Sequence, residues 1–163
     1  MKAASLKVPL VWAGPVLVLD QLSKLWVSAA FQLHESQPII PGLFNLTFIT
    51  NTGAAFGILA GAQSLGRQVF FVGVALVALV VLYLAYREYR EQGQIYMVAI
   101  GLVAGGALGN LVDRLRLGHV IDFLDFYFRQ YHWPAFNIAD SAITVGVGLF
   151  LLAGFREHDR TKS

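Results

Sequence analysis

The chain has 163 residues, of which 56% are hydrophobic and only 13% are charged, with a mean hydropathy of +0.61. A soluble domain is about 45–50% apolar and about 25% charged, so this composition argues against a soluble globular protein. The formal net charge of +2 and the lack of a long basic run argue against a disordered or nucleic-acid-binding chain. The absence of cysteine excludes disulfides, thiolate nucleophiles and cysteine-based metal sites.

Four apolar stretches are long enough to cross a membrane as helices. A hydrocarbon core about 30 Å thick needs about 20 mainly apolar residues per helix. We predict spans over about 8–31, 69–86, 95–111 and 138–155. The second is the clearest because it contains no charged residue and ends at a polar stop, residues 87–91. The whole chain, 1–163, is expected to form one integral membrane domain.

The first stretch also has the features of a signal peptide. Lys2 and Lys7 precede its apolar run, and residues 27–29 (Val-Ser-Ala) resemble a small-residue cleavage site. However, Asp20 and Lys24 lie inside the run, which is longer than the roughly 7–15 apolar residues of a signal peptide. A membrane span is therefore the favoured interpretation.

Spacing of glycines and distribution of charge indicate how the spans are arranged. Gly101, Gly105 and Gly109 share one face of the third span, a spacing that suits close helix packing in lipid. With four spans, both termini and the loop 87–94 lie on one side. That side collects Lys2, Lys7, Arg87, Arg90, Arg156, Arg160 and Lys162, against four basic residues opposite. The positive-inside rule therefore predicts cytoplasmic termini.

Both outer loops are longer than simple connectors. Residues 32–68 include an alternating apolar and polar pattern over 44–48 after a Pro-Gly turn, which predicts a hairpin or small sheet. Residues 112–137 carry several Asp and His side chains. The polar chemistry of the chain therefore gathers on the outer side.

Polar side chains of the spans and outer loops fall at one depth. An ionisable group at a helix centre in lipid costs at least about 2.5–3.5 kcal/mol, so such a group is a functional hypothesis. The third span runs outward and the fourth runs inward, so the end of one meets the start of the other. The residues concerned are Asp20, Asn110, Asp113, Asn137 and Asp140, with Asp122 in the intervening loop. They predict one polar pocket near the outer leaflet.

Two aspartates in that pocket suggest acid–base chemistry. If Asp122 and Asp140 approach to hydrogen-bonding distance, like-charge repulsion and desolvation keep one of them protonated at neutral pH. The ionised carboxylate then takes a proton from water while the protonated one polarises a carbonyl. Such a pair hydrolyses an amide without a covalent intermediate.

Some polar residues also have structural interpretations. Asp20 and Lys24 form an i,i+4 pair, and mutual neutralisation of buried charge favours a structural or positioning role for both. Asp113 and Arg114 are as consistent with an interfacial ion pair that orients the third span as with a site-shaping role. These alternatives stay open at the level of sequence.

Other chemistries have weak support. His119 and Asp122 are three residues apart, and two candidate ligands are a weak metal signal. Ser141 lacks the Gly-x-Ser-x-Gly surroundings of a serine nucleophile. Asp125 and the stretch 132–134 are expected at the loop surface.

Two other classes of membrane protein fit the composition. A proton- or ion-coupled transporter also uses carboxylates within the membrane, but it needs polar groups along the full depth. The stretch 69–86 and the inner half of the third span have none. A structural assembly subunit would use the glycine face for packing, and it leaves the outer Asp and Asn cluster unexplained. The pattern therefore favours an enzyme.

Five sequence blocks resemble one known family. They are DQLSK at 20–24, NTGAAF at 51–56, GGALGNLVDR at 105–114, GHVIDF at 118–123 and FNIADS at 136–141. Each block is a weak signal alone, but together they follow the family order over nearly the whole chain. The chain resembles bacterial lipoprotein signal peptidase, also called signal peptidase II.

The resemblance implies an aspartic endopeptidase of the bacterial inner membrane, with cytoplasmic termini and an active site near the periplasmic face. Its substrates would be prolipoproteins whose lipobox cysteine carries a diacylglyceryl group, cut on the amino side of that cysteine. Its other partners would be membrane lipids and the cyclic peptide antibiotic globomycin, which occupies the family's substrate site. No cofactor, metal or nucleic-acid partner is implied.

The resemblance also assigns roles to residues. It implies Asp122 and Asp140 as the catalytic pair. The supporting and substrate-binding residues would be Asp20, Lys24, Asn51, Gly53, Asn110, Asp113, Arg114 and Asn137. We further expect a small sheet over 43–56 on the membrane surface and a short helical lid over 55–65, with Phe56 covering the acyl chains. The expected fold class is an all-α membrane protein with four transmembrane helices, plus a small periplasmic β-sheet or hairpin and a short periplasmic helix in the first outer loop.

Overall fold

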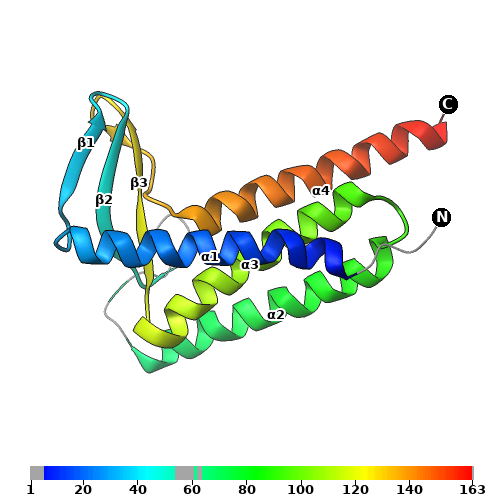
Figure 1. Cartoon of the computed structure of the whole chain (residues 1–163), viewed down its shortest axis with the longest axis horizontal. Helices are drawn as coiled ribbons and strands as arrows, with labels where there is room; N and C mark the ends of the chain where they lie inside the picture. The colour runs from blue at the N-terminus through cyan, green and yellow to red at the C-terminus, as the bar shows by residue number, and fades with distance from the viewer. Residues whose placement is uncertain (1–5, 54–60, 62–63, 163) are drawn as a thin grey trace.

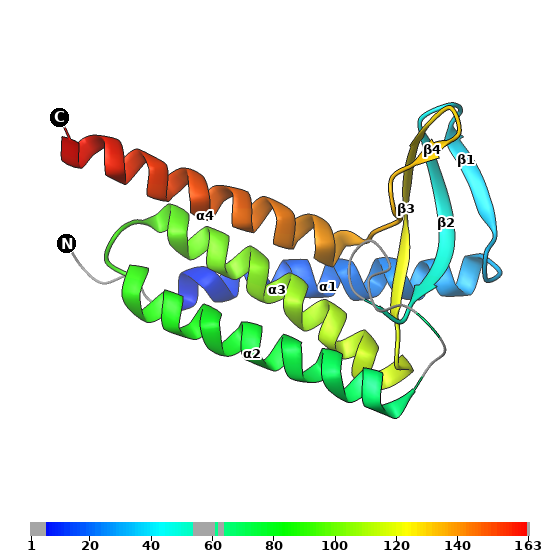
Figure 2. The same cartoon turned by 180° about the vertical axis from the view of Figure 1, so that it is seen from behind.

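The computed structural model describes residues 6–53, 61 and 64–162 of the chain. Four helices, α1 (Lys7–Ala30), α2 (Leu65–Tyr89), α3 (Gln94–Leu117) and α4 (Ile138–Lys162), are accompanied by four strands, β1 (Ser36–Ile40), β2 (Phe44–Asn51), β3 (Val120–Phe128) and β4 (Tyr131–His132). The helices run along the long axis of the molecule and the sheet stands across one end (Figure 1). The view from behind shows that α1 begins and α4 ends on the side of the bundle away from the sheet (Figure 2).

The four helices correspond to the four apolar stretches predicted from the sequence, with α1 ending at Ala30, one residue before the predicted end. Each helix is long and apolar enough to cross a membrane, so the prediction of four long apolar helices is confirmed. Their outward surfaces are apolar as well. Within α2, all of whose residues are described, Phe71 is the one buried side chain, while Val69 and Val77 are more than half exposed. Such a surface is suited to lipid and not to water.

Helix α3 lies at the centre of the bundle because its glycines let neighbouring backbones come close. A Cβ added at Gly101 would lie 2.6 Å from the Pro9 carbonyl oxygen, and one at Gly105 would lie 2.7 Å from the Ala13 oxygen. These contacts leave no room for a side chain between α3 and α1. The predicted glycine face is therefore the packing face between these two helices.

Replacing Gly105 by alanine is expected to destabilise the fold by about 1–3 kcal/mol, because the new methyl group meets backbone that cannot move aside alone. Thermal unfolding in detergent micelles measures the effect. Gly73 on α2 is the matched control, since a Cβ there meets nothing within 4 Å. Gly73→Ala is expected to be neutral or stabilising by up to about 1 kcal/mol. Equal stability of the two variants would contradict the packing role.

The sheet has the antiparallel order β1-β2-β3-β4 and draws on both outer segments. Strand β2 pairs with β3 so that Asn45 lies opposite Asp125 and Ile49 opposite Asp122, with an irregularity in register between Leu46 and Ile49. The prediction that the sheet lies within the first outer loop of an otherwise all-α fold was wrong, because β3 and β4 belong to the second outer segment. The expected helical lid over 55–65 falls mainly on residues outside those that the structure describes.

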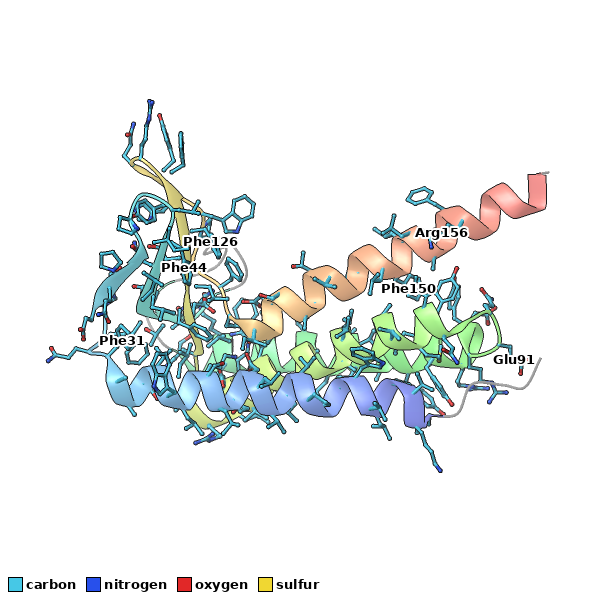
Figure 3. The ribbon with its side chains drawn as sticks, turned by 45° about the horizontal axis from the view of Figure 1, so that its top comes forward. Phe31, Phe44, Glu91, Phe126, Phe150 and Arg156 are labelled. Atoms are coloured by element: carbon cyan, nitrogen blue, oxygen red, sulfur yellow. The ribbon has the colours of Figure 1, made fainter. Side chains whose placement is uncertain are left out.

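An apolar cluster fixes the sheet to the ends of the helices. Val27 of α1 is buried against Ile121 and Phe123 of β3, so Asp122 is held between two anchored neighbours. On the sheet itself, Phe44 and Phe126 pack with ring centroids 4.7 Å apart (Figure 3). The sheet is therefore a rigid support for the side chain of Asp122.

Candidate active site

Helix α4 begins at a capped N-terminus that places Asp140. Asn137 is the capping residue, and its Oδ1 accepts a hydrogen bond from the Asp140 backbone N–H at 2.9 Å. Asparagine is among the preferred N-cap residues. Asp140 therefore lies in the first turn of α4, where the positive end of the helix dipole favours a carboxylate.

Asp122 on β3 is held by two amides. Its Oδ1 accepts a hydrogen bond from Asn137 Nδ2 at 2.7 Å, and its Oδ2 accepts one from Asn51 Nδ2 at 3.1 Å. Only 2% of the residue is exposed. The side chain of Asn137 thus binds Asp122 with one end and the backbone of Asp140 with the other.

Asn110 on α3 binds the second carboxyl group. Its Nδ2 donates to Asp140 Oδ1 at 2.8 Å, while its Oδ1 accepts from Lys24 Nζ at 2.9 Å and from Asn137 Nδ2 at 3.3 Å. Asp122 and Asp140 are therefore connected through the amides of Asn110 and Asn137.

Lys24 is the centre of a buried charge network behind these amides. Its ammonium contacts Asp20 Oδ2 at 2.8 Å, Asp113 Oδ2 at 2.9 Å and Asn110 Oδ1 at 2.9 Å. Three donors thus meet three acceptors. Asp20 also accepts a hydrogen bond from the Ala139 backbone N–H at 2.9 Å. This network joins α1, α3 and the start of α4.

The two neighbours Asp113 and Arg114 are directed to different partners. Asp113 bonds to Lys24, whereas Arg114 donates from Nη2 to the Gly53 carbonyl oxygen at 2.9 Å and lies over the Phe71 ring. The interpretation of Asp113 and Arg114 as an ion pair orienting α3 therefore gives way to two separate roles. Asp113 completes the buried network, and Arg114 holds the chain at Gly53.

Gln21 belongs to the network, although we did not assign it to the site from the sequence. Its Nε2 lies 2.9 Å from Asp113 Oδ1, 3.1 Å from the Gly109 carbonyl oxygen and 3.2 Å from Asp20 Oδ2. The available signal was its position directly after Asp20 in the first motif block. Burying a polar side chain such as that of Gln21 within a membrane span costs free energy unless the side chain has hydrogen-bond partners.

A pocket of about 450 Å³ opens beside the two carboxyl groups. Its polar side is formed by Asn51, Asn110, Arg114, Asp122 and Asp140. Its other walls are mostly apolar and come from 133–136, which precedes α4, and from 143–145 on α4. An apolar pocket with a few convergent polar groups is typical of a substrate site.

Burial is the main influence on the titration of Asp122. Desolvation, with a further contribution from the negative charge of Asp140, raises the pKa of Asp122 to about 7 from an ordinary value of 3.8. The hydrogen bonds from Asn51 and Asn137 and the charge of Lys24 act in the opposite direction and offset the rise only in part. At neutral pH Asp122 therefore exchanges a proton readily, as a general acid or base must.

The structure also revises the alternatives. Asp125, expected at the loop surface, is 7% exposed and accepts hydrogen bonds from Asn45 and His132. The Ser141 hydroxyl donates to the Asn137 carbonyl oxygen at 2.9 Å. Among the residues that the structure describes, no three His, Asp or Glu side chains gather as metal ligands.

Fold and site together define a class of protein. It is a bundle of four helices able to cross a membrane, with a pocket at one end and, beside that pocket, two carboxyl groups that are connected by hydrogen bonds through asparagine side chains. The family model described as signal peptidase (SPase) II matches residues 12–156. The chain therefore belongs to the signal peptidase II family, membrane proteases that cleave signal peptides from lipoprotein precursors, and it is a multi-pass membrane protein. The resemblance found in the sequence is confirmed.

Similar proteins cover nearly the whole chain. The lipoprotein signal peptidase of Syntrophus aciditrophicus is 52% identical over 154 residues, covering 94% of this chain and 95% of that protein. The lipoprotein signal peptidase of Syntrophotalea carbinolica is 48% identical over 160 residues, covering 98% of each. Two solved bacterial membrane enzymes superpose with TM-scores of 0.87 and 0.81 at 33% and 34% identity, covering 98% and 93% of this chain and 94% and 95% of theirs.

Proposed function

We propose that this chain is an aspartic endopeptidase that removes signal peptides from diacylglyceryl-modified prolipoproteins, on the amino side of the lipidated cysteine. Asp122 and Asp140 are the catalytic pair. The observation that carries this assignment is the double role of Asn137, which donates to the Asp122 carboxyl group and accepts from the Asp140 backbone. One amide thereby links the Asp122 carboxyl group to the backbone of Asp140, and both carboxyl groups line the same pocket.

In the proposed reaction the two carboxyl groups share one proton. The ionised carboxylate removes a proton from water, and the resulting hydroxide attacks the scissile carbonyl carbon. The protonated carboxyl group donates its proton to the carbonyl oxygen. Collapse of the tetrahedral intermediate returns a proton to the leaving amine of the cysteine, so that an acid and an amine are formed from an amide and water.

The supporting residues divide into two groups. Asn51, Asn110 and Asn137 orient the carboxyl groups by direct hydrogen bonds. Behind them, Lys24 with Asp20 and Asp113 fixes Asn110 from α1 and α3. Arg114 and Gly53, joined by a hydrogen bond at the rim, bind the substrate backbone.

The proposed place of action is the bacterial inner membrane, with cytoplasmic termini and the pocket near the periplasmic face. Basic residues at the end that carries the termini support this orientation. The substrate's diacylglyceryl group then lies among membrane lipids at the depth of the pocket and arrives laterally. Globomycin is expected to compete for the same pocket.

The test is cleavage of a purified prolipoprotein by the purified protein in detergent or vesicles, with and without the diacylglyceryl group. We expect mass spectrometry to find one cut on the amino side of the lipidated cysteine, inhibition by globomycin and no loss of rate with a chelator. Equal cleavage of the unmodified precursor would overturn the substrate assignment. A rate that depends on added metal would revive the metal hypothesis for His119 and Asp122.

The pKa of Asp122 predicts the pH dependence. Above its pKa of about 7 the pair loses its shared proton, so kcat/KM is expected to fall about tenfold per pH unit on the alkaline side. Cleavage rates between pH 5 and 9 measure this, and a flat profile from about pH 6 to 9 would contradict the shared proton.

The same raised pKa links stability to pH. At a pH between the ordinary pKa of 3.8 and the raised pKa of about 7, Asp122 is ionised in the unfolded chain and protonated in the folded one, so folding takes up a proton. The stability that this proton contributes is fully present below pH 3.8 and is lost as the pH rises through about 7. Asp140→Asn removes the neighbouring charge and is expected to make this loss smaller and shift it to lower pH in thermal unfolding.

A further inference from the structure

One wall of the pocket is a short segment, residues 133–136, that joins β4 to α4; we call it the wall segment. It runs along β3 and is bonded to it at both ends. The Trp133 N–H donates to the Phe126 carbonyl oxygen at 2.8 Å, and Phe136 exchanges backbone hydrogen bonds with Leu124 at 2.8 and 3.1 Å. The shape of the pocket therefore depends on how this segment is held against the strand.

The strand preceding the wall segment presents its side chains to two different faces. His132 is the register partner of Tyr127, and their rings stack with centroids 4.9 Å apart. Because side chains alternate along a strand, Asp125, Tyr127 and His132 share one face. The next residue, Trp133, points to the other face and lines the pocket with Asp122. A group that holds His132 therefore sets the position of Trp133 from behind.

Such a group is present on that rear face. His132 Nδ1 lies 2.8 Å from Asp125 Oδ1 and 3.1 Å from Oδ2, and Asn45 Nδ2 donates to Asp125 Oδ2 at 2.9 Å. Asp125 and Asn45 are 7% and 9% exposed. A buried carboxylate is costly unless hydrogen bonds satisfy it, so these contacts bind β2, β3 and β4 to one another. We call Asn45, Asp125 and His132 the anchor.

We propose that the anchor is a positioning device for substrate binding, which fixes the wall segment and thereby sets the affinity of the pocket for the peptide around the scissile bond. The inference rests on the proposed function in one respect, namely that the pocket beside Asp122 takes the substrate. The anchor lies behind β3 and acts through Trp133 and Phe136. Its loss is therefore expected to change KM, while kcat, which depends on the carboxyl pair, stays close to that of the wild type.

Two substitutions at one position separate the hydrogen bond from ring packing. His132→Phe keeps a ring against Tyr127 but removes the Nδ1 donor, whereas His132→Asn places an amide nitrogen near the position of Nδ1. The His132 side chain is about half exposed, so water competes for this hydrogen bond and its loss in His132→Phe is expected to raise KM about threefold, with kcat within about 1.5-fold. His132→Asn is expected to return KM to within about 1.5-fold of the wild type. Equal KM values for His132→Phe and the wild type would overturn the proposal.

Removing the acceptor gives an independent test. Asp125→Leu keeps a side chain of similar size but takes away the acceptor of the hydrogen bonds from Asn45 and His132, so KM is expected to rise. Adding His132→Phe to Asp125→Leu is expected to change KM by less than about twofold, because the hydrogen bond is already absent. An effect of His132→Phe that is as large in Asp125→Leu as in the wild type would overturn the proposal.

A measurement without catalysis reports on the wall segment itself. In a background with Trp12→Phe and Trp26→Phe, Trp133 is the remaining tryptophan. Trp133 is 58% exposed, so the useful readout is the mobility of its ring. The steady-state anisotropy of its fluorescence is expected to fall in His132→Phe and to return toward the wild-type value in His132→Asn. Lower anisotropy with an unchanged KM would overturn the proposal and leave the proposed function intact. Full cleavage by Asp122→Asn would overturn the proposed function, and the anisotropy would still report whether the anchor holds Trp133.

Discussion

Replacing either Asp122 or Asp140 by asparagine is expected to lower kcat by about 10³-fold or more, because each variant removes the acid or the base of the proposed pair. Asparagine has nearly the shape of aspartate and keeps one acceptor oxygen, so at position 122 one of the two hydrogen bonds from Asn51 and Asn137 is retained. The fold is therefore expected to survive. Single-turnover cleavage of a diacylglyceryl-modified prolipoprotein measures the loss, and thermal unfolding in the same detergent verifies folding.

Glu91→Gln is the control for loss of a carboxylate. Glu91 is 60% exposed and lies near the far end of the bundle from the sheet (Figure 3), so its neutralisation is expected to leave kcat within about twofold of the wild type. Wild-type kcat in a folded Asp122→Asn or Asp140→Asn variant would remove that residue from the catalytic pair. Loss of activity in Glu91→Gln would show that the assay responds to charge in general.

The second large effect is expected at Lys24. Lys24→Met keeps most of the side-chain length but leaves the carboxylates of Asp20 and Asp113 buried together without their shared cation. Breaking a buried ion pair from one side costs about 3–5 kcal/mol. The variant is therefore expected to unfold at a much lower temperature, with loss of cleavage, because Asn110 loses its donor from Lys24.

Two comparisons make the test of Lys24 specific. Arg90 and Glu91 form an exposed pair at 3.9 Å, so Arg90→Ala is expected to change stability by no more than about 0.5 kcal/mol. Adding Asp20→Asn and Asp113→Asn to Lys24→Met removes the uncompensated charge and is expected to recover part of the lost stability. A Lys24→Met variant as stable as the wild type would contradict the network.

The four helices were predictable from sequence because length and apolar composition decide whether a segment suits a membrane. The pairing of Asp20 with Lys24 was also predictable, since i,i+4 spacing on a helix is a local rule. The convergence of Asn110, Asn137 and Asp140 followed from the alternating direction of the spans. These features depend on neighbours in sequence or on the simple up-and-down order of the helices.

Strand β3 was not predicted because its sequence lacks alternation. Ile121 and Phe123 pack on Val27 of α1, while Phe126 on the opposite face packs with Phe44 of β2. Both faces are therefore apolar, and the sequence lacks the alternation of apolar and polar residues that is typical of a strand with one solvent-exposed face. Pairing with β2 decides its structure, and such pairing across distant parts of the chain has no local signature.

The same reason explains the errors at individual polar residues. The sequence predicts Asp125 at the surface because its partners, Asn45 on β2 and His132 on β4, become neighbours only when the sheet forms. Asp113 was considered with adjacent Arg114, but its cation comes from Lys24 on another helix. Sequence indicated which side chains needed partners and left the choice of partner to the tertiary fold.

The contacts of Lys24 also have a consequence for biogenesis. Asn110 lies 86 residues after Lys24 in the chain, so at about 5–20 residues per second roughly 4–17 s of translation separate them. Of the three partners of Lys24, Asp20, Asp113 and Asn110, only Asp20 has been synthesised before Lys24 itself. The other oxygen of Asp20 binds Ala139, 119 residues further along. The i,i+4 pair of Asp20 and Lys24 can therefore form within the first helix alone, whereas the complete set of hydrogen bonds at the site requires the start of the last helix.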